Sequence, residues 1–131
     1  METKAKTILI ADDDSDYLTI MEANIQSLGF KTITASSQKE CETLLDTVKP
    51  DLAIFDLMMD NKDSGFILSY KIKNKYPEVP VIIATAVTAE TGLVFGINTQ
   101  TERQWIKADK YMDKGIRKDQ LNAEIRKLLK M

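Results

Sequence analysis

The sequence predicts an α/β fold in which a doubly wound parallel sheet of five strands is covered by helices on both faces. Five short apolar runs, rich in β-branched residues, alternate with five segments of helical periodicity, which is the order of elements expected for a parallel sheet. The runs are apolar throughout, as expected of strands that are buried on both faces. A length of 131 residues suits one domain with a sizeable core. We therefore expect residues 1–131 to form a single domain.

The first two strands flank a helix with clear start and stop signals. The run at 7–11 is the first strand, and it ends abruptly in three aspartates. A helix is expected to begin at Asp14 or Ser15 and to end at Gly29, because Asp and Ser cap helix starts and glycine often follows helix ends. The second strand is expected at 30–35. The inner face of the helix is predicted from residues spaced by four, four and three, namely Tyr17, Met21, Ile25 and Leu28.

The central strand, expected at 52–55, is followed by Asp56. The helix before it is capped by Ser36 or Ser37, where the sequence fits a Ser-x-x-Glu capping box, and Pro50 closes the segment. The residues expected on the inner face of this helix are Leu44, Leu45 and Val48.

The second half of the chain is less regular. A polar loop is expected at 60–65, where Asp, Asn and Ser precede a glycine. Residues 87–99 predict no regular element, because Gly92 and Gly96 would interrupt a helix. The other expected elements are a helix at 66–76 halted by Pro77, a strand at 79–84, a helix at 101–107, a strand at 109–112, a loop at 114–115, and a helix at 118–130 with Leu121, Ile125 and Leu128 inward.

The composition excludes several kinds of site. The chain has no histidine, which excludes His-based metal sites and Ser/His or Cys/His nucleophile pairs. Its single cysteine, Cys41, rules out an internal disulfide and is expected in or at the edge of the core. The net charge of -2 gives no reason to expect direct nucleic-acid binding, and no apolar run approaches the roughly 18 residues of a membrane span. We expect a cytoplasmic protein without membrane contact.

Chemically useful side chains follow four of the expected strands. Right-handed crossovers bring the carboxyl ends of parallel strands to one edge of the sheet, where ligands usually bind. The residues at such ends are Asp12, Asp13, Asp56, Thr85 and Lys114. We therefore expect these side chains to meet in one acidic pocket.

The expected pocket suits phosphoryl transfer. Two like charges about 4 Å apart cost roughly 4 kcal/mol at an effective dielectric near 20, so clustered carboxylates require a cation or a proton. An oxygen-only cluster suits Mg²⁺, which accepts one or two carboxylates together with phosphoryl oxygens. Asp56 could act as a nucleophile toward phosphorus, Lys114 could neutralise developing charge, and Thr85 could donate a hydrogen bond to the new phosphoryl group.

These residues, in this order, resemble the response-regulator receiver domains of two-component signalling, and the resemblance runs along the whole chain. Tyr111 adds to it, because it lies three residues before Lys114, where the family carries an aromatic switch residue. The resemblance implies a flavodoxin-like (βα)5 fold with strand order 2-1-3-4-5.

The resemblance also implies a role for each residue of the pocket. Asp56 would take a phosphoryl group from a phosphohistidine on a sensor histidine kinase or a histidine phosphotransfer protein, since this chain has no histidine of its own. Lys114 and Thr85 would grip the phosphoryl oxygens. Thr85 and Tyr111 would then switch a surface for a downstream protein or for a phosphorylation-dependent homodimer. The groups that would hold Mg²⁺ are Asp12, Asp13, Asp56 and the backbone carbonyl of Met58.

Three features depart from the family pattern. Lys114 precedes Gly115, whereas the family usually has a proline with a cis bond there, so the lysine could be placed differently. Asp60 follows Met59 where the family usually has a proline, and the loop to Gly65 is one residue longer. The interval between Thr85 and Lys114 is also about two helical turns longer than usual, with the excess in 87–99.

Three functions remain open from the sequence. The first is a stand-alone receiver that works by binding another protein. The second is a pseudo-receiver that is never phosphorylated and serves as an interaction module, an alternative that Gly115 and the unusual loops keep open. The third is an aspartyl-phosphate phosphatase. Such enzymes generally carry a second Asp two residues after the nucleophile, and the presence of Met58 at that position disfavours a true enzyme.

Overall fold

The computed structural model describes residues 5–61, 63–85 and 108–131. Its five strands form one parallel sheet in the order β2-β1-β3-β4-β5, which confirms the expected order. The strands are β1 (Thr7–Ala11), β2 (Lys31–Ala35), β3 (Leu52–Asp56), β4 (Val81–Thr85) and β5 (Lys110–Asp113). The described helices are α1 (Ser15–Ser27), α2 (Gln38–Leu45), α3 (Ser64–Lys75) and α6 (Lys118–Leu128). The helix expected at 101–107 and the segment 87–99 lie outside the described residues.

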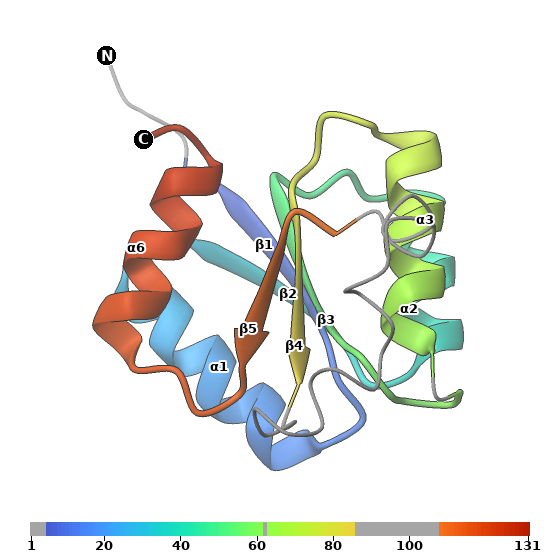
Figure 1. Ribbon diagram of the computed structural model, residues 1–131, viewed down its shortest axis with the longest axis horizontal. Coiled ribbons are helices and arrows are strands. Elements are labelled where there is room, and N and C mark those ends of the chain that lie inside the picture. Colours follow the sequence, from blue (N-terminus) through green and yellow to red (C-terminus); the bar gives the residue numbers. More distant parts are fainter. Residues whose placement is uncertain (1–4, 62, 86–107) are drawn as a thin grey trace.

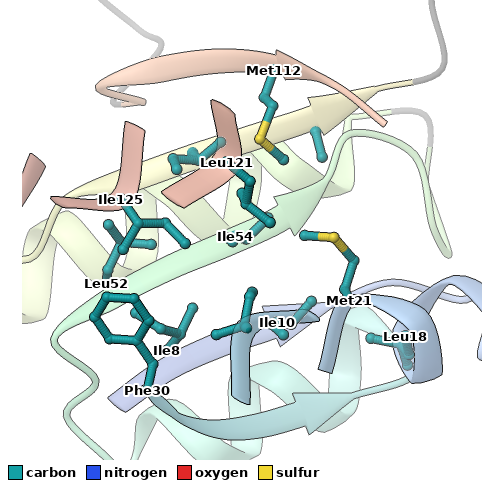
Figure 2. Close-up of a cluster of buried hydrophobic side chains, with 13 residues drawn as sticks. Ile8, Ile10, Leu18, Met21, Phe30, Leu52, Ile54, Met112, Leu121 and Ile125 are labelled. Atoms are coloured by element: carbon teal, nitrogen blue, oxygen red, sulfur yellow. The ribbon is translucent and has the colours of Figure 1, made fainter. Parts of the chain in front are cut away.

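Helices cover both faces of the sheet (Figure 1). Helices α1 and α6 pack on one face, where Met21 and Ile25 of α1 and Leu121 and Ile125 of α6 share one buried cluster with side chains of β1, β3 and β4. Figure 2 shows Met21, Leu121 and Ile125 within this cluster. Helices α2 and α3 pack on the other face around Phe55. Every residue of β3 is buried, as expected of a central parallel strand. The sheet is thus packed against helices on both sides.

The strand register places the suspected site at one edge of the sheet. Asp56 pairs with Ala84, and Thr85 pairs with Asp113. Ala11, the residue before Asp12, pairs with Phe55, the residue before Asp56. The carboxyl ends of β1, β3, β4 and β5 therefore finish close together, as the sequence predicts.

Both helix starts predicted near aspartate and serine carry side-chain caps. Asp14 caps α1, and its carboxylate accepts hydrogen bonds from the N–H groups of Asp16 and Tyr17. Ser37 caps α2 by accepting the N–H of Glu40 at 3.0 Å. The Glu40 carboxylate accepts the N–H of Ser36 at 2.5 Å instead of that of Ser37. The reciprocal half of the predicted capping box is therefore shifted by one residue.

Several element boundaries differ from the expectation. Helix α2 ends at Leu45, because the N–H groups of Asp46 and Thr47 donate to carbonyls three residues back and tighten the last turn. Val48 therefore lies outside the helix. Helix α6 ends at Leu128, and Lys130 has a positive φ of 59° that a helix cannot contain. Strand β4 runs from Val81 instead of 79 and includes Thr85, and β5 is displaced by one residue from 109–112.

The third helix begins earlier than expected. Ser64 and Gly65, assigned to a polar loop from the sequence, form the first turn of α3. Tertiary contacts cause the difference, because Gly65 donates its N–H to the carbonyl of Leu57 at 2.8 Å and Ser64 is completely buried. The start of α3 is thus attached to the end of β3.

The inner face of α1 is also partly different from the prediction. Met21 and Ile25 are buried as expected, but the third buried position is Leu18. Tyr17 and Leu28 are only partly buried and lie at the border of the core. Gly29, with φ of 99°, follows the helix and adopts the left-handed conformation that favours glycine. Cys41 is buried in the core, as predicted.

None of the helices in the described part of the chain is both long and apolar enough to cross a lipid bilayer.

Candidate functional site

Three aspartates meet where β1 and β3 end. One carboxylate oxygen from each of Asp12, Asp13 and Asp56 lies within 4.8 Å of the other two. Asp12 and Asp56 are buried, whereas Asp13 is exposed. Two hydrogen bonds hold Asp12 in place. Its backbone N–H donates to the carbonyl of Ala35 in β2 at 3.0 Å, and its carboxylate accepts the N–H of Asp14 at 2.9 Å. The predicted acidic cluster is present.

Lys114 supplies the only ammonium group that the described residues place on this cluster. Its Nζ lies 2.7 Å from Oδ2 of Asp12 and 3.3 Å from Oδ1 of Asp56. The Lys114–Gly115 peptide bond is trans, yet the lysine still reaches both carboxylates. Its backbone N–H donates to the carbonyl of Thr85 at 2.9 Å, and the N–H of Gly115 donates to Oδ1 of Asp113 at 2.6 Å. Backbone hydrogen bonds thus hold the loop after β5 in place.

Burial and the neighbouring charges shift the pKa values of Asp56 and Lys114. Burial and the neighbouring Asp12 carboxylate raise the pKa of Asp56 to about 6, although Lys114 acts in the opposite direction. Burial alone would lower the pKa of Lys114, but the carboxylates of Asp12 and Asp56 outweigh it and raise that pKa. Lys114 is therefore a permanent cation at neutral pH, and it does not fully compensate its carboxylate neighbours.

The donor set fits a hard divalent cation. Oδ2 of Asp12 is buried, and its polar contact among the described residues is the 2.7 Å ion pair with Lys114. Three carboxylates against one ammonium leave excess negative charge, and all the donor atoms are oxygens, as Mg²⁺ prefers. Asp12, Asp13 and Asp56 could together hold such an ion.

The structure also describes the other predicted site residues, Thr85, Met58 and Tyr111. Thr85 is the last residue of β4. Met58 follows β3 in the loop, and its side chain is half exposed. Tyr111, in β5, is partly buried and packs its ring edge-on against Phe66 of α3, with centroids 6.5 Å apart. Burial raises the pKa of Tyr111 to about 12. Phe66, which the sequence analysis did not connect with the site, is therefore a direct neighbour of the predicted switch residue.

A buried polar network supports the loop that follows Asp56. Oε1 of Gln38, at the start of α2, accepts hydrogen bonds from Oγ of Ser64 at 2.7 Å and from Nδ2 of Asn61 at 3.0 Å. Nε2 of Gln38 donates to Glu42 at 2.9 Å, which in turn pairs with Lys71. The network therefore fixes this loop, which has no proline, through a residue on a different helix. No sequence signal pointed to Gln38.

Replacing Gln38 with leucine should destabilise the protein by about 1–3 kcal/mol, because it removes the acceptor of the Asn61 side-chain amide and one of the two acceptors of the buried Ser64 hydroxyl, which keeps only the carbonyl of Asn61. Urea denaturation measures the effect. The matched control is Gln26→Leu, which removes an exposed hydrogen bond to Thr32 and should cost less than about 0.5 kcal/mol. Equal costs for the two variants would contradict a supporting role for the network.

Comparison with known proteins decides the family. Residues 8–126 match the family model described as "Response regulator receiver domain". The chain belongs to the response regulator receiver family. Receiver domains are signalling modules of two-component systems, and in response regulators they interact with histidine kinases. The resemblance to receiver domains and the expected flavodoxin-like fold are thereby confirmed.

Curated relatives of this receiver domain are longer proteins. It is 29% identical over 125 residues to the alkaline phosphatase synthesis transcriptional regulatory protein PhoP of Bacillus subtilis, covering 95% of this chain and 49% of PhoP. It is 32% identical over 130 residues to the probable transcriptional regulator ycf27 of Guillardia theta, covering 99% of this chain and 47% of ycf27. The chain thus spans about half the length of these relatives.

Solved structures show the same fold. A CheY-like receiver domain protein from Methanospirillum hungatei superimposes with a TM-score of 0.80 at 24% identity, covering 97% of this chain and 95% of that one. The response regulator TrrA from Thermotoga maritima, solved in complex with Mg(2+)-BeF, gives a TM-score of 0.76 at 23% identity, covering 94% of this chain and 98% of that one.

Proposed function

We propose that this receiver domain accepts a phosphoryl group on Asp56 from a phosphohistidine of a sensor histidine kinase or a histidine phosphotransfer protein. The observation that carries the proposal is the contact of Lys114 with both Asp12 and Asp56 beside the three-carboxylate cluster. A carboxylate nucleophile, a cation for the phosphoryl oxygens and a set of metal-binding oxygens are thereby in one pocket.

The chain's own residues account for each part of the transfer. An oxygen of the Asp56 carboxylate attacks phosphorus while the bond from phosphorus to the imidazole nitrogen breaks, and the histidine leaves with the electron pair. Lys114 moves from the carboxylates onto the phosphoryl oxygens, and Thr85 donates its hydroxyl to them. Mg²⁺, held by Asp12, Asp13, Asp56 and the backbone carbonyl of Met58, would supply charge neutralisation for the same oxygens.

Phosphorylation would then be transmitted through Thr85 and Tyr111. Movement of the Thr85 hydroxyl toward the phosphoryl group favours one of two arrangements of the Tyr111 ring, next to Phe66. A change from 1:99 to 99:1 between such arrangements needs about 5.5 kcal/mol of differential stabilisation. The altered surface would bind a downstream protein or a second copy of the domain. We place this exchange in the cytoplasm, in keeping with the single free cysteine.

Incubation with acetyl phosphate and Mg²⁺ tests the proposal. Intact-protein mass spectrometry should show the addition of one phosphoryl group, which should disappear in Asp56→Asn and when EDTA removes the metal. The matched control is Asp60→Asn, an equal charge change at an exposed residue of the same loop, which should still be phosphorylated. A wild-type protein that gains no mass, and shows no spectral change with beryllofluoride, would support the pseudo-receiver alternative instead.

A further inference from the structure

Lys114 has a third neighbour besides the two carboxylates. Its Nζ lies 4.7 Å from the centroid of the Tyr17 ring, within the roughly 6 Å over which a cation is attracted to the face of an aromatic ring. Tyr17 belongs to the first turn of α1, and Lys114 follows β5. Both elements reach the edge of the sheet where the strands end (Figure 1).

The Tyr17 ring is held independently of Lys114. The backbone N–H of Tyr17 donates to the capping carboxylate of Asp14 at 3.2 Å. The Tyr17 side chain packs against the core between the sheet and helices α1 and α6. The ring therefore forms one side of the pocket and packs against the core behind it. The Lys114 side chain is 20% exposed, so this ring and the carboxylates of Asp12 and Asp56 together define the position of its ammonium group.

In this chain the Tyr17 ring can help to position the ammonium group of Lys114. Lys114 is followed by glycine, which restricts the backbone less than any other residue. A single side-chain hydrogen bond, from the N–H of Gly115 to Asp113, orders the next residue. When a phosphoryl group arrives, the ammonium has to leave the carboxylates for the phosphoryl oxygens, and the face of the Tyr17 ring is a contact that it can keep during that movement.

The face of the ring, and not the hydroxyl group, makes this contact. The hydroxyl oxygen of Tyr17 is shielded from solvent and has no hydrogen-bond partner among the described residues. Burial, together with the carboxylates of Asp12 and Asp56, raises the pKa of Tyr17, so the ring stays neutral. Phenylalanine would therefore preserve the contact, whereas an aliphatic residue of similar size would not.

We propose that Tyr17 is a positioning residue for Lys114, whose ammonium group the ring face keeps beside Asp56 as the phosphoryl group is transferred. The proposal rests on the proposed function. The competing explanation is that Tyr17 only fills space at the border of the core, in which case leucine would serve equally well.

Phosphorylation kinetics with acetyl phosphate at saturating Mg²⁺ test the proposal. Tyr17→Leu should lower the maximal rate about fivefold, the effect of losing one partly shielded cation–π contact, with little change in the acetyl phosphate concentration that gives half-maximal rate. Tyr17→Phe should stay within about twofold of the wild type. The matched control is Tyr76→Leu, which removes a ring whose centroid lies 5.7 Å from the Nζ atoms of both Lys49 and Lys75, away from the pocket. This variant should not change the rate of phosphorylation.

A series of fluorinated phenylalanines at position 17 separates positioning from packing. Each added fluorine weakens the negative face of the ring with little change in its size, so the rate should fall stepwise. A flat series, or a Tyr17→Leu variant as fast as the wild type, would overturn the proposal.

A second measurement does not depend on phosphorylation. In NMR spectra the ε-methylene protons of Lys114 should be shifted upfield by the ring in the wild type and in Tyr17→Phe but not in Tyr17→Leu. Absence of that shift in the wild type would overturn the proposed contact. If the shift is present but the wild type cannot be phosphorylated, the proposed function fails, and with it the role of Tyr17 in transfer.

Discussion

Gly65→Ala is expected to lower the free energy of unfolding by about 2–3 kcal/mol, the usual cost of forcing extra volume into a packed site. A Cβ at this position would lie 2.7 Å from the backbone oxygen of Asp56 and 2.9 Å from Cα of Leu57. Both atoms belong to the backbone where β3 ends, so neither can turn away as a flexible side chain would. The start of α3 or the end of β3 has to move.

The same substitution should weaken the site. Gly65 also donates its N–H to the carbonyl of Leu57 at 2.8 Å, and a shift there displaces Asp56 relative to Asp12 and Lys114. We expect Mg²⁺ affinity, measured by calorimetry, and the rate of phosphorylation by acetyl phosphate both to fall at least about tenfold, because misplacing reacting groups by about 1 Å costs up to about 100-fold.

Gly29→Ala separates a general loss of stability from a loss at the site. Gly29 has a positive φ of 99° but no atom within 4 Å of the position of a Cβ, so alanine should cost about 1 kcal/mol through backbone strain alone. Mg²⁺ affinity should not change in this control. A Gly65→Ala variant with normal stability and normal Mg²⁺ affinity would show that the backbone at the end of β3 is not confined by α3.

The predictable part of this site comes from topology. Once five apolar runs alternate with helices, right-handed crossovers bring the carboxyl ends of the strands together. Asp12, Asp13, Asp56 and Lys114 could therefore be assigned to one pocket from the sequence alone. Their contacts depend on the backbone of rigid strands, which neither loop length nor the trans bond after Lys114 disturbs.

The missed part depends on tertiary contacts that leave no periodic signal. Tyr17 fits the helical pattern of the inner face, but Leu18 takes the buried position and leaves Tyr17 beside Lys114. Gln38 is an ordinary polar residue in the first turn of a helix, and its role follows only from its contact with Ser64 at the start of α3. That contact also explains why α3 begins earlier than the sequence suggested.

Asp56→Asn should make the protein more stable by about 2–3 kcal/mol above pH 7 in the absence of divalent cations. The pKa of Asp56 is about 6 in the folded protein, against 3.8 for the unperturbed group. Between these values the folded state binds more protons than the unfolded state, so the stability of the wild type falls as the pH rises from about 4 to about 6 and stays low above that. Each unit of pKa difference corresponds to about 1.36 kcal/mol.

The pH dependence distinguishes this explanation from a simple change in packing. Asparagine does not titrate, so the stability advantage of Asp56→Asn should disappear as the pH approaches 4, and urea denaturation across the pH range measures it. Asp60→Asn, at an exposed position of the same loop, should show no such advantage. Mg²⁺ should add stability to the wild type by binding its folded state, and much less to Asp56→Asn. An advantage that is constant with pH, or unaffected by Mg²⁺, would mean that an ionised Asp56 is not what destabilises the unliganded pocket.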